Sequence, residues 1–224
     1  MELKSTSKLK NNGIKILVYG SSGVGKTTLI KTLSGKTLIL STENGLLPLK
    51  GTDIPYISVS SLKQLGESYE YILTHKAEYN NIVLDSVSDI AETILIEEKK
   101  KVADARLAYT KVSDIMKGCV KSLRDIENLT VIVIAQSDFL QDDNQHMIFA
   151  PNMPGGKLAN SLPYLFDEVF YLHAVEDKDT HEIVRKLQTQ PDGRYTAKDR
   201  SGMLNIYEEA NLTQIINKIQ GEEK

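Results

Sequence analysis

Eight consecutive residues near the start of the chain have the types and the spacing of a phosphate-binding loop. They are Gly20, Ser21, Ser22, Gly23, Val24, Gly25, Lys26 and Thr27, which fit the pattern G-x-x-x-x-G-K-[ST] at every fixed position and are followed by Thr28. Glycines let successive backbone N–H groups turn toward an anion, and the N-terminus of a following helix favours negative charge. The Lys26 ammonium would reach the β- and γ-phosphates, and the Thr27 hydroxyl would bind Mg²⁺. The motif predicts a site for ATP or another nucleoside triphosphate, with Mg²⁺ as its metal.

The residues on both sides of this loop predict the elements that must position it. The apolar run at 14–19 reads as a strand, and residues 28–33 read as the first turns of a helix. A glycine turn that merely opens an ordinary helix is the alternative interpretation. The order strand, glycine loop, helix favours the phosphate site.

A second apolar strand, at 82–84, ends in Asp85, whose carboxylate could hold Mg²⁺ through a water molecule. The alternative is an aspartate that only caps the next helix. The residue after Asp85 is Ser86, whereas proteins of the AAA+ class usually carry a catalytic glutamate there. This difference weighs against the AAA+ class.

Two further strands end in polar residues that could serve hydrolysis. Glu43 follows the strand at 37–40, and Gln136 follows the strand at 131–135. Ligands of an open α/β sheet bind at the carboxyl ends of its strands. Glu43 could therefore deprotonate the attacking water, and Gln136 could contact the γ-phosphate or that water. A solvated loop acid and an ordinary polar strand end are the alternatives.

The rest of the chain alternates strand-length apolar runs with helical patterns. Strands are expected at 14–19, 37–40, 54–59, 82–84, 131–135, 169–172 and 183–188. Helices are expected from Ser60 or Ser61 to about His75, at 90–101, at 109–126, and around Leu212, Ile215, Ile216 and Ile219. This order predicts an α/β fold, with a mostly parallel central sheet flanked by helices on both faces. The polar segment 136–154 shows no period and is expected to be a functional or mobile loop.

Length and composition set the remaining limits. The 224 residues, 41% of them hydrophobic, suit one domain over 14–224 after a flexible tail at 1–13. A net charge of −3 restricts any nucleic-acid-binding surface to a local patch. The single cysteine excludes an internal disulfide, and the four histidines lack metal-ligand spacing. With no apolar run near the about 18 residues of a membrane span and no secretory signal, we expect a cytoplasmic protein without a membrane partner.

Taken together, four motifs resemble the core of RecA-type ATPases. They read GSSGVGKT, ILSTENG, IVLDSVSDI and VIVIAQ, in the family's order, and the resemblance covers residues 14–205. The chain is similar in particular to the minimal, core-only RecA-like proteins of bacteriophages, some of which anneal single strands. The resemblance implies an ATPase that acts on single-stranded DNA in recombination or annealing, with ATP between the subunits of a ring or filament. A single-strand-binding protein is a further candidate partner.

The same resemblance suggests which residues would contact DNA. RecA-like recombinases place a DNA-binding loop after the glutamine, and here it would span 137–157 and close with Gly155, Gly156 and Lys157. A first DNA loop would fall at 102–108, between two helices. The cations near that loop are Lys99, Lys100, Lys101 and Arg106, which could neutralise phosphates. A surface loop with a glycine turn, and a solvated helix face, are the alternatives.

A pair of cations near the C-terminus could complete the site from a neighbouring subunit. Lys198 and Arg200 are two residues apart, a spacing that puts both on one face of a strand. RecA-type and DnaB-type proteins use a basic pair at this place to reach the ATP of the adjacent subunit, where it stabilises charge on the transferred phosphoryl group. An ordinary basic turn is the alternative.

The sequence also departs from the RecA pattern. No aromatic residue follows Glu43 until Tyr56, although some relatives place one near the adenine, and Asp138, Asp142 and Asp143 would repel phosphate. These departures keep open a nucleotide-dependent protein-binding switch in DNA replication, such as a helicase loader or accessory ATPase.

Two other classes of phosphate-loop protein fit less well. Nucleotide kinases usually carry an arginine-bearing lid, and no arginine occurs here between Asp125 and Arg185. GTPases carry an N-K-x-D tetrapeptide that reads the base, and this chain has none.

Overall fold

The computed structural model describes residues 13–43, 45–141 and 145–221. Except for Gly13, the predicted tail at 1–13 lies outside this range. The strands are β1 (Lys15–Gly20), β2 (Thr37–Ser41), β3 (Tyr56–Ser58), β4 (Asn81–Asp85), β5 (Thr130–Gln141), β6 (Met147–Pro151), β7 (Glu168–Glu176), β8 (Ile183–Gln188), β9 (Lys198–Asp199) and β10 (Tyr207–Glu209). The α-helices are α1 (Lys26–Leu29), α2 (Leu62–His75), α3 (Val87–Lys101), α4 (Ala105–Arg124), α5 (Gly156–Ser161) and α6 (Leu212–Gln220).

These strands join into one sheet in the described part of the chain. Its main order is β10-β8-β7-β1-β5-β4-β2-β3, with β6 paired to β5 and β9 paired to β7. The pairings from β7 through β1, β5, β4 and β2 to β3 are parallel, and those of β6, β8, β9 and β10 are antiparallel. All seven strands predicted from the sequence are present, and the predicted fold class is confirmed.

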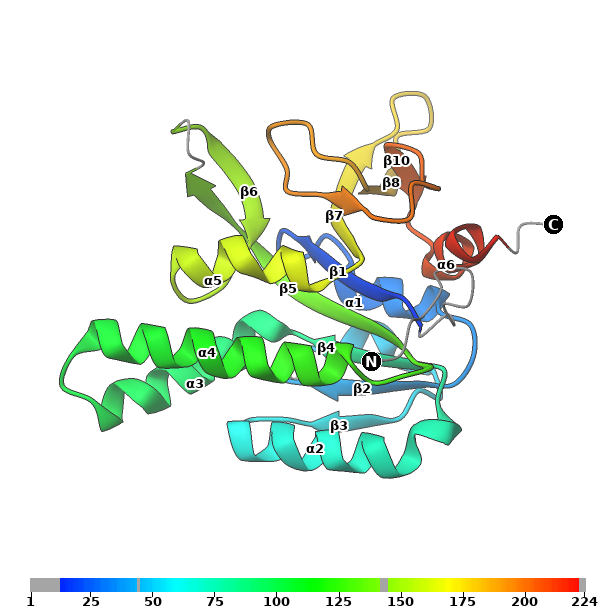
Figure 1. The fold of residues 1–224 in the computed structure, drawn as a ribbon. Helices are drawn as coiled ribbons and strands as arrows, with labels where there is room; N and C mark the ends of the chain where they lie inside the picture. The colour runs from blue at the N-terminus through cyan, green and yellow to red at the C-terminus, as the bar shows by residue number, and fades with distance from the viewer. Residues whose placement is uncertain (1–12, 44, 142–144, 222–224) are drawn as a thin grey trace, which may run out of the picture.

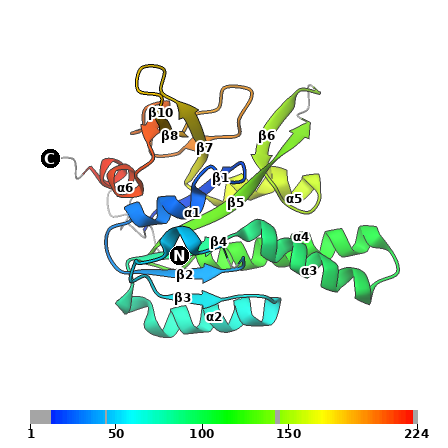
Figure 2. The same ribbon diagram turned by 180° about the vertical axis from the view of Figure 1, so that it is seen from behind.

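Helices cover both faces of the sheet, as Figures 1 and 2 show. Leu17 and Tyr19 of β1 face a core shared with α2, α3, α4 and α5. Ile16 and Val18 face the opposite core, which includes apolar residues of α1 and α6. The central strands are buried along both faces, which explains why they appear in the sequence as unbroken apolar runs.

The polar segment at 136–154 is not a structureless loop, so that prediction is wrong. Strand β5 continues to Gln141 and pairs antiparallel with β6, so that the two form a β-hairpin that projects from the sheet (Figure 1). Phe139 lies directly opposite Phe149, with their ring centroids 4.2 Å apart. Contact between these two rings stabilises the pairing of β5 with β6. The surrounding Asp, Asn and Gln residues are typical of a loop, so the sequence did not indicate these strands. Asp142 and Asp143, predicted to repel phosphate, lie outside the described residues.

The predicted loop at 102–108 is also shorter than expected. Helix α4 begins at Ala105, because the Asp104 carboxylate accepts a 2.8 Å hydrogen bond from the Arg106 N–H and caps the helix. The α3–α4 pair projects on the same side of the molecule as the β5–β6 hairpin in both views (Figures 1 and 2). No helix among the described residues is long and apolar enough to cross a membrane.

A buried acid at the start of β7 predicts a pH-dependent stability. Glu168 is 1% exposed, and burial together with the charge of Asp199 raises its pKa from 4.5 to about 8. Because the folded pKa exceeds the unfolded one, this group's contribution to stability is fully present below pH 4.5 and is lost as pH rises through about 8. We expect Glu168→Gln to raise the melting temperature at about pH 9 and to flatten its dependence on pH between about 4.5 and 8.

The measurement is the melting temperature across this pH range. Glu67→Gln is the matched control, because Glu67 is exposed and pairs with Lys63 on the surface of α2. Parallel curves for wild type and Glu168→Gln would contradict the prediction.

Candidate nucleotide site

The carboxyl ends of β1, β2, β4 and β5 meet around a cleft of about 440 Å³. Its lining includes Ser22, Gly23, Gly25, Lys26, Thr27 and Thr28 from the predicted phosphate loop, together with Glu43, Asp85 and Gln136. The other three predicted loop residues do not line the cleft but lie next to residues that do. Gly20 ends β1, Ser21 follows it, and Val24 packs into the core. Gly23 and Gly25 have φ of 75° and 105°, a conformation that side chains strongly disfavour.

Lys26 lies across the mouth of the phosphate loop. Its ammonium donates hydrogen bonds to the carbonyl oxygens of Gly20 at 2.8 Å and Ser21 at 2.9 Å. Burial lowers the pKa of Lys26, and the charges of Asp85 and Glu43 act in the opposite direction. The ammonium is thus held at the loop by backbone oxygens that a phosphate group could replace.

Thr27 and Asp85 form an oxygen pair suited to Mg²⁺. The Thr27 hydroxyl donates a 2.8 Å hydrogen bond to Oδ2 of Asp85, which is buried at the end of β4. Burial raises the pKa of Asp85, while Thr27 and the Lys26 charge lower it. A carboxylate and a hydroxyl beside a phosphate site are the hard oxygen ligands that Mg²⁺ prefers, so these residues fit the ion.

Glu43 and Gln136 meet through an acid that the sequence analysis did not select. Asp89, in the first turn of α3, accepts hydrogen bonds from the Gln136 side-chain amide at 3.2 and 3.3 Å. The Ser86 hydroxyl donates to Glu43 at 3.3 Å and also contacts Asp89. A hydrogen bond with Asp89, followed by burial and the charges of Asp89 and Asp85, raises the pKa of Glu43 to about 7. The available sequence signal was Ser86-x-x-Asp89, the spacing of a helix capping box.

A comparison with protein families decides the membership of the chain. The model of the AAA domain matches residues 12–201, which contain every residue of the cleft described above. The chain belongs to the AAA domain family. The family supports nucleotide binding and hydrolysis, and the argument from Ser86 against the AAA+ class stays a prediction. A search of curated proteins found no match.

This AAA domain contains a second residue that the sequence analysis missed. Arg185 of β8 lines the cleft, and its Nε donates a 2.8 Å hydrogen bond to the Val24 carbonyl. The side chain lies over Gly25, where an added Cβ would come within 2.6 Å of Nε. No local sequence signal could reveal this contact, because it depends on the pairing of β8 with β7 beside the phosphate loop.

We expect Arg185→Ala to weaken ATP binding about tenfold, because a guanidinium offers further N–H donors toward phosphate oxygens. The measurement is a calorimetric Kd for a non-hydrolysable ATP analogue. Lys186→Ala is the matched control, since neighbouring strand residues point to opposite faces. Arg185→Lys should recover only part of the affinity, because it restores charge without the planar fork. An unchanged Kd in Arg185→Ala would exclude this role.

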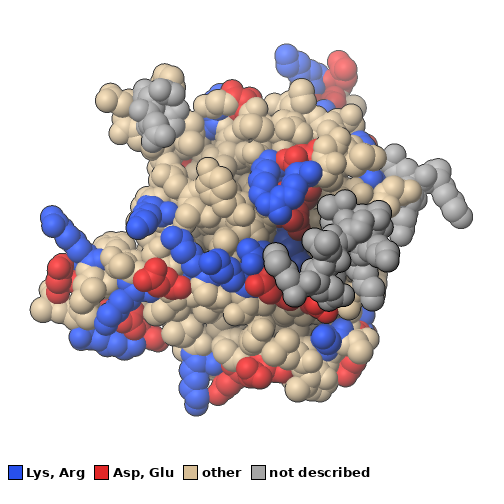
Figure 3. Space-filling model, viewed as in Figure 1, with Lys and Arg blue, Asp and Glu red and all other residues tan. Residues whose placement is uncertain are grey.

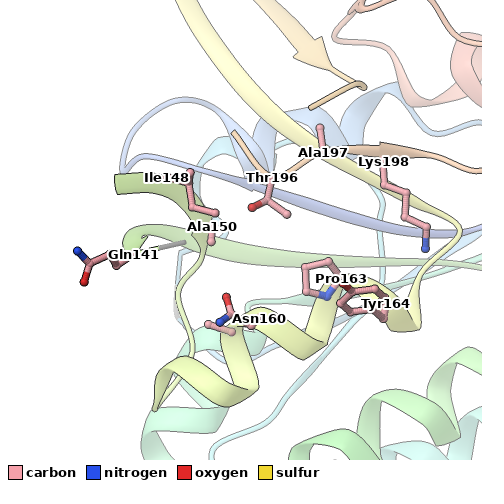
Figure 4. A pocket seen from close by; sticks show the side chains of 10 residues that line it. Gln141, Ile148, Ala150, Asn160, Pro163, Tyr164, Thr196, Ala197 and Lys198 are labelled. Carbon is pink, nitrogen blue, oxygen red and sulfur yellow. The ribbon is translucent and has the colours of Figure 1, made fainter. Parts of the chain in front are cut away.

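The AAA domain places the predicted basic pair far along the sheet from its own phosphate loop. Lys198 and Arg200 lie beside the amino end of β7, where Lys198 donates to the Phe166 carbonyl and Arg200 pairs with Asp167 at 2.8 Å. Lys198 also lines a second cavity, of about 450 Å³, near Thr196 and Tyr164 (Figure 4). The pair does not line the cleft of its own subunit, so its contact with an adjacent subunit stays a prediction, beside the alternative of an ordinary basic turn.

Only some of the predicted DNA-binding residues of the AAA domain lie close together. Lys99 lies 5.0 Å from the ring centre of Tyr109, and Tyr109 lines a small groove with Gly155 and Lys157. Gly156 begins α5 at the edge of this groove. Lys101 instead pairs with Glu98 at 2.6 Å, and Lys100 and Arg106 are exposed. On the face shown in Figure 3, Lys and Arg over α3 and α4 are interspersed with Asp and Glu.

Proposed function

We propose that this protein is a RecA-like, Mg²⁺-dependent ATPase that acts on single-stranded DNA in recombination or annealing. The observation that carries the proposal is the position of Gln136, which belongs both to the cleft and to the root of the β5–β6 hairpin. Its side chain donates to Asp89, and its carbonyl accepts a 2.7 Å hydrogen bond from the Asn152 N–H. The Ser88 hydroxyl contacts the same two residues, accepting from the Gln136 N–H at 3.0 Å and donating to the carbonyl of Asn152, the residue after β6, at 2.7 Å. A change at the γ-phosphate would therefore reach the hairpin.

In this proposal, residues 14–224 act as one ATPase domain within a ring or filament. Lys26 binds the β- and γ-phosphates, and Thr27 and Asp85 hold Mg²⁺, which when bound neutralises phosphate charge. Glu43 accepts a proton from the attacking water, and Gln136 orients that water or senses the γ-phosphate. Lys198 and Arg200 complete the site of the adjacent subunit, so hydrolysis would depend on assembly.

Steady-state ATP hydrolysis tests this function, measured with and without single-stranded DNA at low and moderate salt. We expect DNA to raise the rate, the rise to fade as salt increases, and Lys26→Ala to abolish it. A rate indifferent to DNA, with no retention of the protein on DNA at low salt, would overturn the proposal.

The second candidate function is a nucleotide-dependent switch that binds a protein during DNA replication. It is favoured by the apolar side chains that the hairpin exposes, because Phe139 is 51% and Met147 is 57% exposed. In that case the ATPase rate would be the same with and without DNA, and nucleotide would alter retention of a replication protein instead.

A further inference from the structure

Six aromatic rings from five segments (β5, β6, β7, the loop before β9, and β10) form a continuous ladder that begins in the β5–β6 hairpin. They are Phe139, Phe149, Tyr171, His173, Tyr195 and Tyr207. Phe149 and Tyr195 stack almost in parallel, at 10° and 4.9 Å between ring centres. Both ends of the ladder are open to solvent, since Phe139 is 51% and Tyr207 is 49% exposed.

The ladder is attached directly to the phosphate loop. The hydroxyl of Tyr19, at the end of β1, lies within hydrogen-bonding distance of two carbonyl oxygens, that of Phe149 at 2.9 Å and that of Thr196 at 2.7 Å, which share its single proton. The Tyr171 hydroxyl lies 3.4 Å from the Ser21 hydroxyl. The inner rings are thus fixed by the same strand that ends in the ATP cleft, so the outer rings stand on a rigid base.

A cation accompanies the rings. The Arg194 guanidinium lies 5.6 Å from the ring centre of Tyr195 and 5.9 Å from that of Phe149. Arg194 is exposed, and it forms no ion pair with a carboxylate among the residues that the structure describes. The nearby Asp192 carboxylate instead accepts hydrogen bonds from the backbone N–H groups of Arg194 and Tyr195, both at 2.9 Å.

We propose that this ladder is a platform on which bases of single-stranded DNA stack, with Arg194 beside their phosphates. The inference rests on the proposed function. It assigns DNA binding to this ladder, whereas the sequence analysis assigned it in part to the lysines of α3. Every base has a π-face, so stacking on Phe139 and Tyr207 would tolerate any sequence, and a planar cation both stacks and pairs with phosphate. An apolar protein partner would use the same rings but would have no need of the exposed guanidinium of Arg194.

Fluorescence anisotropy with two labelled strands tests the platform: an oligothymidylate and an abasic strand of equal length and charge. Wild type should prefer the thymidylate strand, and Phe139→Ala or Tyr207→Ala should each weaken that binding about tenfold. Binding of the abasic strand should change little, because its phosphates are unaltered. Arg194→Ala should weaken binding of both strands.

Two controls keep the result interpretable. Tyr56→Ala removes an aromatic ring that is 58% exposed on β3, away from the ladder, and should leave DNA binding unchanged. Tyr207→Trp introduces the sole tryptophan of the chain, because the sequence contains none. Its fluorescence should be quenched by the thymidylate strand and not by the abasic strand.

The outcomes separate this inference from the proposed function. If wild type binds both strands equally, or the ring variants bind like wild type, the platform is excluded while DNA binding stands. If wild type binds neither strand, the proposed function and the platform both fail. A protein partner that protects Tyr207→Trp from quenching by iodide, when DNA does not, would also overturn the platform.

Discussion

Replacing Glu43 by glutamine is expected to lower kcat for ATP hydrolysis by about 10²- to 10⁴-fold while ATP affinity stays within about twofold of wild type. The Glu43 carboxylate lines the cleft, and its pKa of about 7 suits a general base near neutral pH. A glutamine amide has similar shape but cannot accept the proton. Since the change removes one of three neighbouring acids, Glu43, Asp85 and Asp89, the melting temperature should not fall. Single-turnover hydrolysis and a binding titration measure the two effects separately.

The pH profile gives a second readout for the same residue. A base acts when it is deprotonated, so the wild-type rate should rise as pH increases through about 7 and fall away below it. The Glu43→Gln variant should lack this limb. Glu67→Gln, on the surface of α2, serves as the control. Hydrolysis at the wild-type rate in Glu43→Gln would exclude Glu43 as the base.

The sequence was most informative where chemistry and topology coincide. Parallel strands carry their ligands at their carboxyl ends, so apolar runs ending in Glu43, Asp85 and Gln136 could be assigned to one edge before any coordinates were known. The structure places all three around the phosphate loop. The strands themselves were predictable because burial on both faces leaves unbroken apolar runs.

Contacts between distant segments were beyond sequence reasoning. Arg185 reaches Gly25 only because β8 folds back antiparallel on β7, and nothing in the residues around Arg185 indicates the phosphate loop. The hairpin was missed because its aromatic pair, Phe139 and Phe149, is separated by polar residues that resemble a loop.

Replacing Asp85 by asparagine is expected to lower ATP hydrolysis about 10- to 100-fold and to raise the Mg²⁺ concentration needed for half-maximal rate. Asparagine retains an oxygen that can accept the Thr27 hydroxyl hydrogen bond, so the change removes charge and leaves shape nearly intact. Because burial raises the pKa of Asp85, the charged carboxylate is unfavourable in the metal-free protein. The melting temperature in EDTA should therefore rise.

The opposite signs of these two effects are what make the experiment decisive. If the Asp85 carboxylate served only folding, its replacement would lower both the melting temperature and the hydrolysis rate. If it is a metal ligand in a buried site, its replacement should lower the rate and raise the melting temperature of the metal-free protein. A Mg²⁺ titration of the steady-state rate and a melting curve in EDTA measure the pair, with Asp114→Asn on the exposed side of α4 as the control. An undiminished rate at the wild-type Mg²⁺ requirement would show that Asp85 does not hold the metal. A fall in melting temperature would mean that its charge is compensated by Thr27 and Lys26 even without Mg²⁺.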